Sequence, residues 1–141
     1  MAQLTEFAGN NLVLVAALLV IAALIIKIEI NLKLSSIPQL NVNEAVRLMN
    51  NGDVIVLDVR ESKEYSTGHI QDAVHIPISA LGKRANELEK YKDKEILAYC
   101  RSGSRSNQAC RTLGKRGFAK VNNLTGGIMS WSSASLPLSK K

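Results

Sequence analysis

Hydrophobic and polar residues follow two different patterns along the chain. Residues 12–26 contain no polar side chain, whereas most of the charged residues follow Asn41. Beyond that point, short apolar runs alternate with segments whose apolar residues recur at helical spacing. The first pattern is typical of a membrane helix, and the second is typical of an α/β domain.

We predict that residues 12–28 form a single transmembrane helix behind a short tail of residues 1–11. The apolar run supplies about 22 Å of helix, and its flanks supply the remainder of the roughly 20 residues that a bilayer requires. A cleaved signal peptide fits less well, because no Lys or Arg precedes the run and no small-residue cleavage site follows it. Lys27 and Lys33 follow the run, so the positive-inside rule places the N-terminus outside and the rest of the chain in the cytoplasm.

Residues 28–34 alternate apolar and polar side chains. Alternation favours a strand, but after a membrane helix it also fits an interfacial extension, and both interpretations stay open. The Ser35-Ser36-Ile37-Pro38 segment is a break. We therefore predict a juxtamembrane linker over residues 29–36, a folded domain over residues 37–137 and a basic tail of residues 138–141.

Strands and helices alternate in the predicted domain. Apolar runs predict strands over residues 54–59, 73–76, 96–99 and 120–123. Helical spacing predicts helices over residues 43–49, 61–67, 79–92 and 105–116, and a short last helix after Gly126-Gly127. The expected N-cap of the first of these helices is Asn41 or Asn43. This order predicts an α/β fold, with a mainly parallel sheet flanked by helices.

The formal net charge of +6 is concentrated late in the chain, since no acidic residue follows Glu95. An electropositive surface around Cys100 favours small anions. We predict no nucleic-acid partner, because no aromatic residues are interleaved with the basic ones and no nucleic-acid-binding motif is present. Anionic lipid is the better alternative, given the neighbouring membrane helix.

Cys100 opens a short polar turn, Arg101-Ser102-Gly103-Ser104-Arg105, between a predicted buried strand and a predicted helix. In an α/β sheet such a turn lies at the carboxyl ends of the strands, where ligands bind. The peptide N–H groups, the start of the helix and the two arginines all favour a thiolate, so we expect the pKa of Cys100 to lie below its ordinary value. We predict that Cys100 is a nucleophile that carries sulfur.

The second cysteine, Cys110, lies on an apolar helix face and is expected to be a small buried residue. Two cysteines at this spacing form neither a disulfide framework nor a zinc site, and they fit a reducing compartment. His69 and His75 belong to no cluster of metal-ligating residues, so we expect them to make structural hydrogen bonds. We predict no metal and no cofactor.

Four separated motifs resemble those of single-domain rhodaneses, specifically the membrane-anchored kind found in proteobacteria. The motifs are Leu57-Asp58-Val59-Arg60, residues 64–70 continuing to 73–77, residues 99–106, and Gly126-Gly127 with Trp131. The resemblance covers roughly residues 37–137. One departure is His75, where the family usually has Asn.

This resemblance implies a rhodanese-like fold and a sulfurtransferase of the thiosulfate sulfurtransferase type. The Cys100 thiolate would take the outer sulfur of a small anionic donor, thiosulfate or a persulfide, and pass it to a thiol or protein acceptor. The backbone N–H groups of residues 101–105 would cradle the transferred sulfur. The resemblance also implies attachment to the inner (plasma) membrane of a bacterium through residues 12–28, with the domain in the cytoplasm.

The length of the loop separates this chemistry from that of cysteine phosphatases, which need Cys-x5-Arg. Arg105 is the fifth residue after Cys100 and Ser106 is the sixth, so the loop suits a single sulfur better than a phosphate.

Two supporting residues follow the first predicted strand of the domain. We expect Asp58 to be structural, either pairing with a loop arginine or capping a turn. Arg60 either contacts substrate or pairs with Glu61 or Glu64.

An alternative function is a membrane-tethered interaction or regulatory module, which binds a membrane protein and transfers little sulfur. The catalytic interpretation requires that the side chain of Cys100 is not sealed in the interior. It also requires that the surrounding peptide groups face that side chain.

Overall fold

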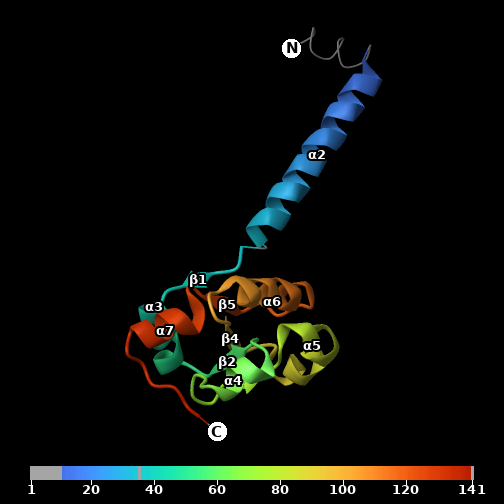
Figure 1. Ribbon diagram of the computed structural model, residues 1–141. Helices are drawn as coiled ribbons and strands as arrows, with labels where there is room; N and C mark the ends of the chain where they lie inside the picture. The colour runs from blue at the N-terminus through green and yellow to red at the C-terminus, as the bar shows by residue number, and fades with distance from the viewer. Residues whose placement is uncertain (1–10, 35, 141) are drawn as a thin grey trace. The chain divides into compact units, whose positions relative to one another are not determined.

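The computed structural model describes residues 11–34 and 36–140, with the backbone alone for residues 29–34 (Figure 1). The chain divides between Ser36 and Ile37 into two compact units. The described part of the first unit forms one long helix. The second contains all the strands and the other helices that the structure describes.

The helix of the first unit is α2 (Leu12–Leu34), drawn in blue in Figure 1. It confirms a helix over residues 12–28, and because residues 28–34 continue it, the strand alternative for them is wrong. Most of its large apolar side chains between Leu12 and Ile28 are exposed, from 54% for Leu24 to 83% for Val13. Within the described residues, no helix combines the length and the apolarity that crossing a membrane requires. This finding does not support the predicted transmembrane span.

The second unit is an α/β domain built on a five-stranded parallel sheet in the order β1-β5-β4-β2-β3. The strands are β1 (Gln39–Leu40), β2 (Val54–Asp58), β3 (Val74–His75), β4 (Glu95–Tyr99) and β5 (Val121–Leu124). The helices are α3 (Val42–Asn51), α4 (Ser62–Ser66), α5 (Ile78–Arg84), the 3-10 helix η1 (Ala85–Tyr91), α6 (Ser104–Lys115) and α7 (Gly127–Ser133). The predicted parallel sheet flanked by helices is confirmed (Figure 1).

Hydrophobic cores lie on both faces of the sheet. Ile96 and Ala98 of β4 belong to the core formed with α5, η1 and α6. Leu97 and Tyr99 belong to the core formed with α3 and α7. Successive strand residues point to opposite faces, and both faces of β4 are covered. This is why residues 96–99 of the strand leading to Cys100 carry no charged side chain.

The helix predicted over residues 79–92 is interrupted. α5 ends at Arg84, and the chain continues as the 3-10 helix η1. Ala85 and Leu88 are both fully buried, and a helix with three residues per turn keeps two residues at this spacing on one side. The spacing of apolar residues does not distinguish this helix from an α-helix.

The short strand β1 has no signal in the hydrophobic pattern. It pairs with β5 through Gln39 opposite Asn123 and Leu40 opposite Leu124. The next residue, Asn41, is the N-cap of α3, since its side chain accepts a hydrogen bond from the Glu44 N–H at 3.0 Å. The Glu44 carboxylate in turn accepts the Asn41 N–H at 2.8 Å. Of the two expected N-caps, Asn41 is correct.

Candidate active site

Cys100 lies at the carboxyl end of β4, the central strand of the sheet. The strand ends at Tyr99 and α6 begins at Ser104, so residues 100–103 form the turn between them. Gly103 has φ +98°, and a Cβ there would lie 3.2 Å from the carbonyl oxygen of Leu124. The positive φ angle and the close approach of the Leu124 carbonyl both explain why this position is occupied by glycine. The predicted strand, turn and helix are confirmed, and they place Cys100 where α/β proteins bind ligands.

Hydrogen-bond donors converge on the sulfur of Cys100. The Gly103 N–H donates to Sγ at 3.1 Å, and Ser106 Oγ lies 3.5 Å from Sγ. Burial raises the pKa of the Cys100 thiol. Hydrogen bonds from the Ser106 side chain and from the backbone N–H groups of Ser106, Gly103 and Ser102 outweigh burial, and the pKa lies below its ordinary value. The peptide groups of the turn therefore face the sulfur.

Ser106 also has a second partner. Its hydroxyl oxygen lies 2.6 Å from Asn123 Oδ1, and the Asn123 amide nitrogen donates to Gly103 O at 3.1 Å and to Gln39 Oε1 at 2.8 Å. A serine hydroxyl carries one proton, so it donates either to Asn123 or to Cys100. The shorter distance favours Asn123, and the backbone N–H groups are therefore the constant donors to the sulfur.

Replacing Ser106 with alanine is expected to raise the pKa of Cys100 by about one pH unit or less, because the backbone donors remain. The measurement is the rate of iodoacetamide alkylation against pH, with the alkylated residue located by mass spectrometry. Cys110 is an internal control, since burial raises its pKa to about 12 and keeps it protonated at neutral pH. An alkylation profile displaced by several pH units would show instead that the hydroxyl is the main donor.

The side chain of Cys100 is almost completely covered, with 1% of the residue exposed. Arg101, Ser102 and Ser104 next to it are exposed, so the burial is confined to Cys100 and its inward-facing neighbours. The catalytic interpretation requires that peptide groups face the sulfur and that the sulfur is not sealed in. The structure meets the first requirement, but in this conformation it does not meet the second.

The start of α7 holds the turn from the other side. The Ile128 N–H donates to Cys100 O at 2.8 Å, and the Met129 N–H donates to Arg101 O at 3.2 Å. Gly127, which directly precedes Ile128, has φ +56°. A Cβ on Gly127 would overlap Cys100 O and lie 2.6 Å from Arg101 O. Only glycine allows this close approach, which gives the Gly126-Gly127 motif a role in the site.

Arg105 forms a bidentate ion pair with Glu64 of α4, with N–O distances of 2.7 and 2.8 Å. The hydrogen bond from Arg105 lowers the pKa of Glu64 to about 2. Glu64 and, to a smaller extent, Cys100 raise the pKa of Arg105. Glu64 therefore keeps the positively charged guanidinium of Arg105 in place near the sulfur. That positive charge favours the thiolate form of Cys100.

The profile of the rhodanese-like domain family matches residues 41–134. The chain belongs to the rhodanese-like family. It is 40% identical over 92 residues to a protein of Allochromatium vinosum named sulfurtransferase, across 65% of this chain and 84% of that protein. It is 29% identical over 139 residues to the Escherichia coli protein YibN, named as uncharacterized, across 98% of this chain and 97% of that protein.

The fold comparison agrees with this assignment. A crystal structure of a rhodanese-related protein from Thermoplasma volcanium superposes with a TM-score of 0.67 at 31% identity, and covers 74% of this chain and 99% of that chain.

In this rhodanese-like domain, Asp58 and Arg60 form a buried ion pair, with exposed fractions of 0% and 4%. Arg60 Nε lies 3.0 Å and Nη2 lies 2.6 Å from the Asp58 carboxylate, and Nη2 also donates to Gly68 O at 2.7 Å. The Arg60 N–H donates to Asp58 as well, at 2.9 Å. Asp58 thus has the predicted structural role. The predicted partners of Arg60, Glu61 and Glu64, are wrong, because Arg60 pairs with Asp58.

The ring of Tyr65 lies between the two histidines of the domain. Its centroid is 4.0 Å from that of His69 and 4.2 Å from that of His75, with the ring planes 10° and 14° apart. His75 Nε2 is also 2.8 Å from Arg60 O. The histidine at the usual Asn position of the rhodanese motif therefore stacks on Tyr65 in addition to making a structural hydrogen bond.

Two residues of the site, Ser106 and Asn123, have no role in the sequence analysis, and Glu64 appears there only as a candidate partner of Arg60, not of Arg105. Glu64 and Ser106 lie inside motifs that were recognised, but the pattern does not show which partner each contacts. Asn123 has no local signal, because it reaches the turn only through the pairing of β5 with β4. Among the described residues, no cluster of His, Cys, Asp and Glu could hold a metal ion.

Proposed function

We propose that the protein is a sulfurtransferase in which Cys100 carries the transferred sulfur as a persulfide. The A. vinosum relative named sulfurtransferase supports the reaction class. The hydrogen bonds that converge on Sγ support the choice of residue. They favour a thiolate, and N–H groups in the same positions would stabilise the terminal sulfur of a persulfide anion.

Thiosulfate is the proposed donor. The Cys100 thiolate attacks its outer sulfur, the sulfur–sulfur bond of thiosulfate breaks, and sulfite leaves with the bonding electron pair. An acceptor thiol then takes the outer sulfur of the persulfide and releases Cys100. Because Sγ is covered, the exposed turn residues must move aside during both steps.

Incubation of the full chain with thiosulfate is expected to make the Cys100-containing peptide heavier by one sulfur atom. Mass spectrometry under non-reducing conditions measures this. Cys100→Ser should show no gain and no transfer to cyanide or a thiol. Cys110→Ser, the matched control, should behave like the wild type, because Cys110 is buried and protonated. If Cys100 stays unmodified with thiosulfate and with persulfide donors, the proposal that Cys100 carries sulfur is wrong.

The coverage of Cys100 favours a second candidate function, a binding module with little turnover. A cysteine with 1% of its surface exposed is poorly placed to meet a donor unless the turn moves. Complementation of a deletion strain separates the two functions. Rescue by Cys100→Ser as full as that by the wild type would support the binding module, and failure of that variant to rescue would support the enzyme. A membrane protein is the proposed partner of such a module.

We further propose that α2 attaches the domain to the cytoplasmic face of a bacterial plasma membrane. The support is its many exposed apolar side chains between Leu12 and Ile28, together with Lys27 and Lys33 in its C-terminal part. The full chain is expected to sediment with membranes and to resist extraction by alkaline carbonate, whereas a form of residues 37–141 stays in the supernatant. A full chain recovered in the supernatant before extraction contradicts this proposal.

A further inference from the structure

A chain of side-chain hydrogen bonds joins the edge of the sheet to the Cys100 turn. It begins at Gln39 of the edge strand β1, whose Oε1 accepts a hydrogen bond from the Asn123 amide nitrogen at 2.8 Å. Asn123 Oδ1 lies 2.6 Å from the Ser106 hydroxyl oxygen, which lies 3.5 Å from Cys100 Sγ. Gln39 is exposed, whereas Asn123 and Ser106 are buried. The chain therefore leads from the surface of the domain to the sulfur.

Two backbone carbonyl groups fix the orientation of both amides. A carbonyl oxygen only accepts hydrogen bonds, so the atom that faces it must be the amide nitrogen. Gln39 Nε2 donates to Ile37 O at 3.1 Å, and Asn123 Nδ2 donates to Gly103 O at 3.1 Å. The oxygen of Gln39 therefore faces Asn123, and the oxygen of Asn123 faces Ser106. An amide oxygen only accepts, so the short contact with Ser106 is a bond that the hydroxyl proton makes.

Asn123 thus competes with Cys100 for the single proton of the Ser106 hydroxyl. When this proton points to Asn123, the serine oxygen presents its lone pairs to Sγ, which suits a thiol that donates rather than a thiolate that accepts. Turning the proton to the thiolate would break the bond to Asn123 Oδ1 in a residue that is only 2% exposed. Breaking a buried hydrogen bond is costly, so the thiolate gains less from Ser106 than a free hydroxyl would give it.

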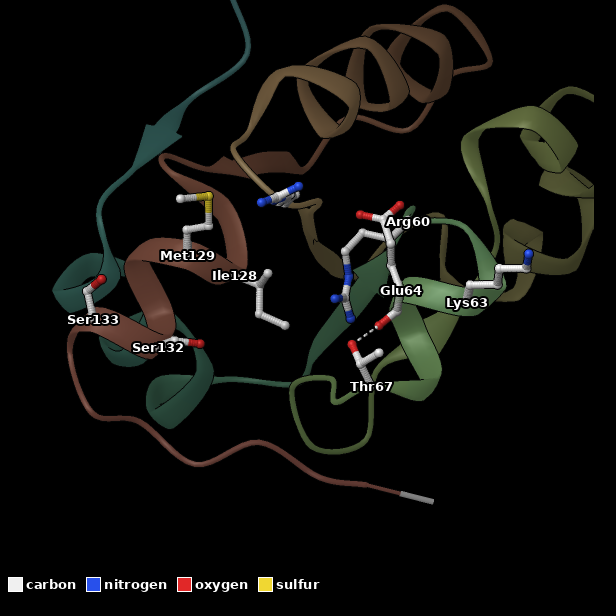
Figure 2. A pocket seen from close by; sticks show the side chains of 9 residues that line it. Arg60, Lys63, Glu64, Thr67, Ile128, Met129, Ser132 and Ser133 are labelled. Carbon is white, nitrogen blue, oxygen red and sulfur yellow. Dashed lines mark hydrogen bonds between the residues drawn. The ribbon is translucent and has the colours of Figure 1, made fainter.

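The charged groups near Cys100 lie outside this chain of hydrogen bonds. Figure 2 shows Arg60 and Glu64 at an open cleft beside the turn, across from Ile128 and Met129 of α7. The strand β5 and the helix α7 carry no ionisable side chain. The charged residues of the turn and of the elements around it are Asp58, Arg60, Lys63, Glu64, Arg101 and Arg105. A variant that changes only the amides therefore leaves these charges in place.

We propose that Asn123 is a positioning residue for the Cys100 thiol, and that Gln39 holds Asn123 in this role. The two amides keep the Ser106 proton on Asn123 Oδ1 and so withhold one donor from the sulfur. A thiolate loses intrinsic nucleophilicity as its pKa falls, so this arrangement preserves the reactivity of Cys100. Its benefit to sulfur transfer rests on the proposed function, whereas the direction of the proton does not.

Asn123→Ala is expected to lower the pKa of Cys100 by about one pH unit, because the released Ser106 hydroxyl can donate to the thiolate. The sign is opposite to that expected for Ser106→Ala. The measurement is the midpoint of the alkylation rate of the full chain with iodoacetamide against pH, with the alkylated residue located by mass spectrometry. The midpoint reports ionisation even where a variant changes access to the sulfur.

Asn122→Ala is the matched control, since it removes a neighbouring buried amide of the same strand. The Asn122 nitrogen donates to Glu95 Oε2 at 2.8 Å and to Ile96 O at 3.3 Å, and makes no contact with the hydrogen-bond chain described above. This variant is expected to leave the pKa of Cys100 unchanged. An equal fall in Asn122→Ala and Asn123→Ala would overturn the proposal, because the shift would then not depend on the contact with Ser106.

A double variant shows whether the effect passes through the serine. In a Ser106→Ala background, Asn123→Ala should produce no further fall in the pKa of Cys100, because no hydroxyl proton remains to be released. A fall of the same size in both backgrounds contradicts the proposal. A pKa that rises in Asn123→Ala alone also contradicts it, since a merely structural role would loosen the turn and weaken the backbone donors.

Gln39→Met tests the same chain from the surface and leaves the buried residues in place. Loss of Oε1 removes one of the two acceptors that hold the Asn123 amide, so the pKa of Cys100 should fall by about 0.3 pH unit or more. Asn107→Ala is its control, because it removes another side-chain partner of Gln39 and leaves the bonds to Ile37 O and Asn123. An unchanged or raised pKa in Gln39→Met overturns the proposal, including where Asn123→Ala does not fold.

Alkylation of Cys100 requires no sulfur transfer, so the two proposals can fail separately. If thiosulfate forms a persulfide on Cys100 but the variants leave its pKa unchanged, the positioning role of Asn123 is wrong and the proposed function stands. If no persulfide forms but the pKa shifts as expected, the proposed function is wrong and the positioning role stands.

Discussion

Replacing Gly127 with alanine is expected to destabilise the domain by about 2–4 kcal/mol and to reduce sulfur transfer at least tenfold. The new Cβ would meet the carbonyl groups of Cys100 and Arg101, and φ +56° is unfavourable for an L side chain. Relief of the overlap requires movement of the peptide that follows Cys100, and such movement displaces the donors around Sγ. Urea unfolding measures the first effect, and thiosulfate-dependent transfer measures the second.

Gly82 provides the matched control, because it lies inside α5 and an added Cβ would meet nothing within 4 Å. Gly82→Ala is expected to leave sulfur transfer unchanged and to stabilise the domain by about 0.5–1 kcal/mol through helix propensity. If Gly127→Ala retained full stability and activity, the close contact between α7 and the Cys100 turn would not be essential to the site.

Replacing Asp58 with alanine is expected to cost about 3–5 kcal/mol of unfolding free energy. Arg60 would stay buried with its charge uncompensated, and the buried Tyr99 hydroxyl would lose the carboxylate with which it interacts. A loss of this size is a large part of the stability of an ordinary domain. Thermal and denaturant unfolding measure it.

Asp53 and Lys94 form an ion pair on the surface and provide the control for this prediction. Asp53→Ala should cost less than about 1 kcal/mol, because the pair is solvent-exposed. The double variant Asp58→Leu with Arg60→Met should lose less than Asp58→Ala, since no unpaired charge remains buried. A cost for Asp58→Ala no larger than that for Asp53→Ala would show that burial of the Asp58–Arg60 pair contributes little.

The central part of the fold could be predicted from local patterns. β4 and the turn at Cys100 are recognisable because an apolar run covered on both faces is followed by a polar segment with a glycine. The capping box of α3 likewise lies within four consecutive residues, Asn41 to Glu44. The change from α5 to η1 and the two-residue β1 could not be predicted, because they depend on packing against distant segments.

The same distinction applies to the site. Cys100 and Gly103 are recognisable from the turn itself, whereas the partner of Arg105 lies 41 residues away in sequence. The sequence offers Asp58, Glu61 and Glu64 as partners for arginines of the site. In the structure Asp58 pairs with Arg60 and Glu64 pairs with Arg105, whereas Glu61 accepts a hydrogen bond from Ser79. The coverage of Cys100 could not be predicted either, since it depends on the packing of the folded domain around this residue.

The pairing of β1 with β5 has a consequence for biosynthesis. Gln39 is among the first residues of the domain to leave the ribosome, but its partner Asn123 is among the last. The long separation makes this pairing slow to form. Cys100 is therefore synthesised before the amide that contacts Ser106, and the nascent domain completes the surroundings of the thiol only after β5 has been made.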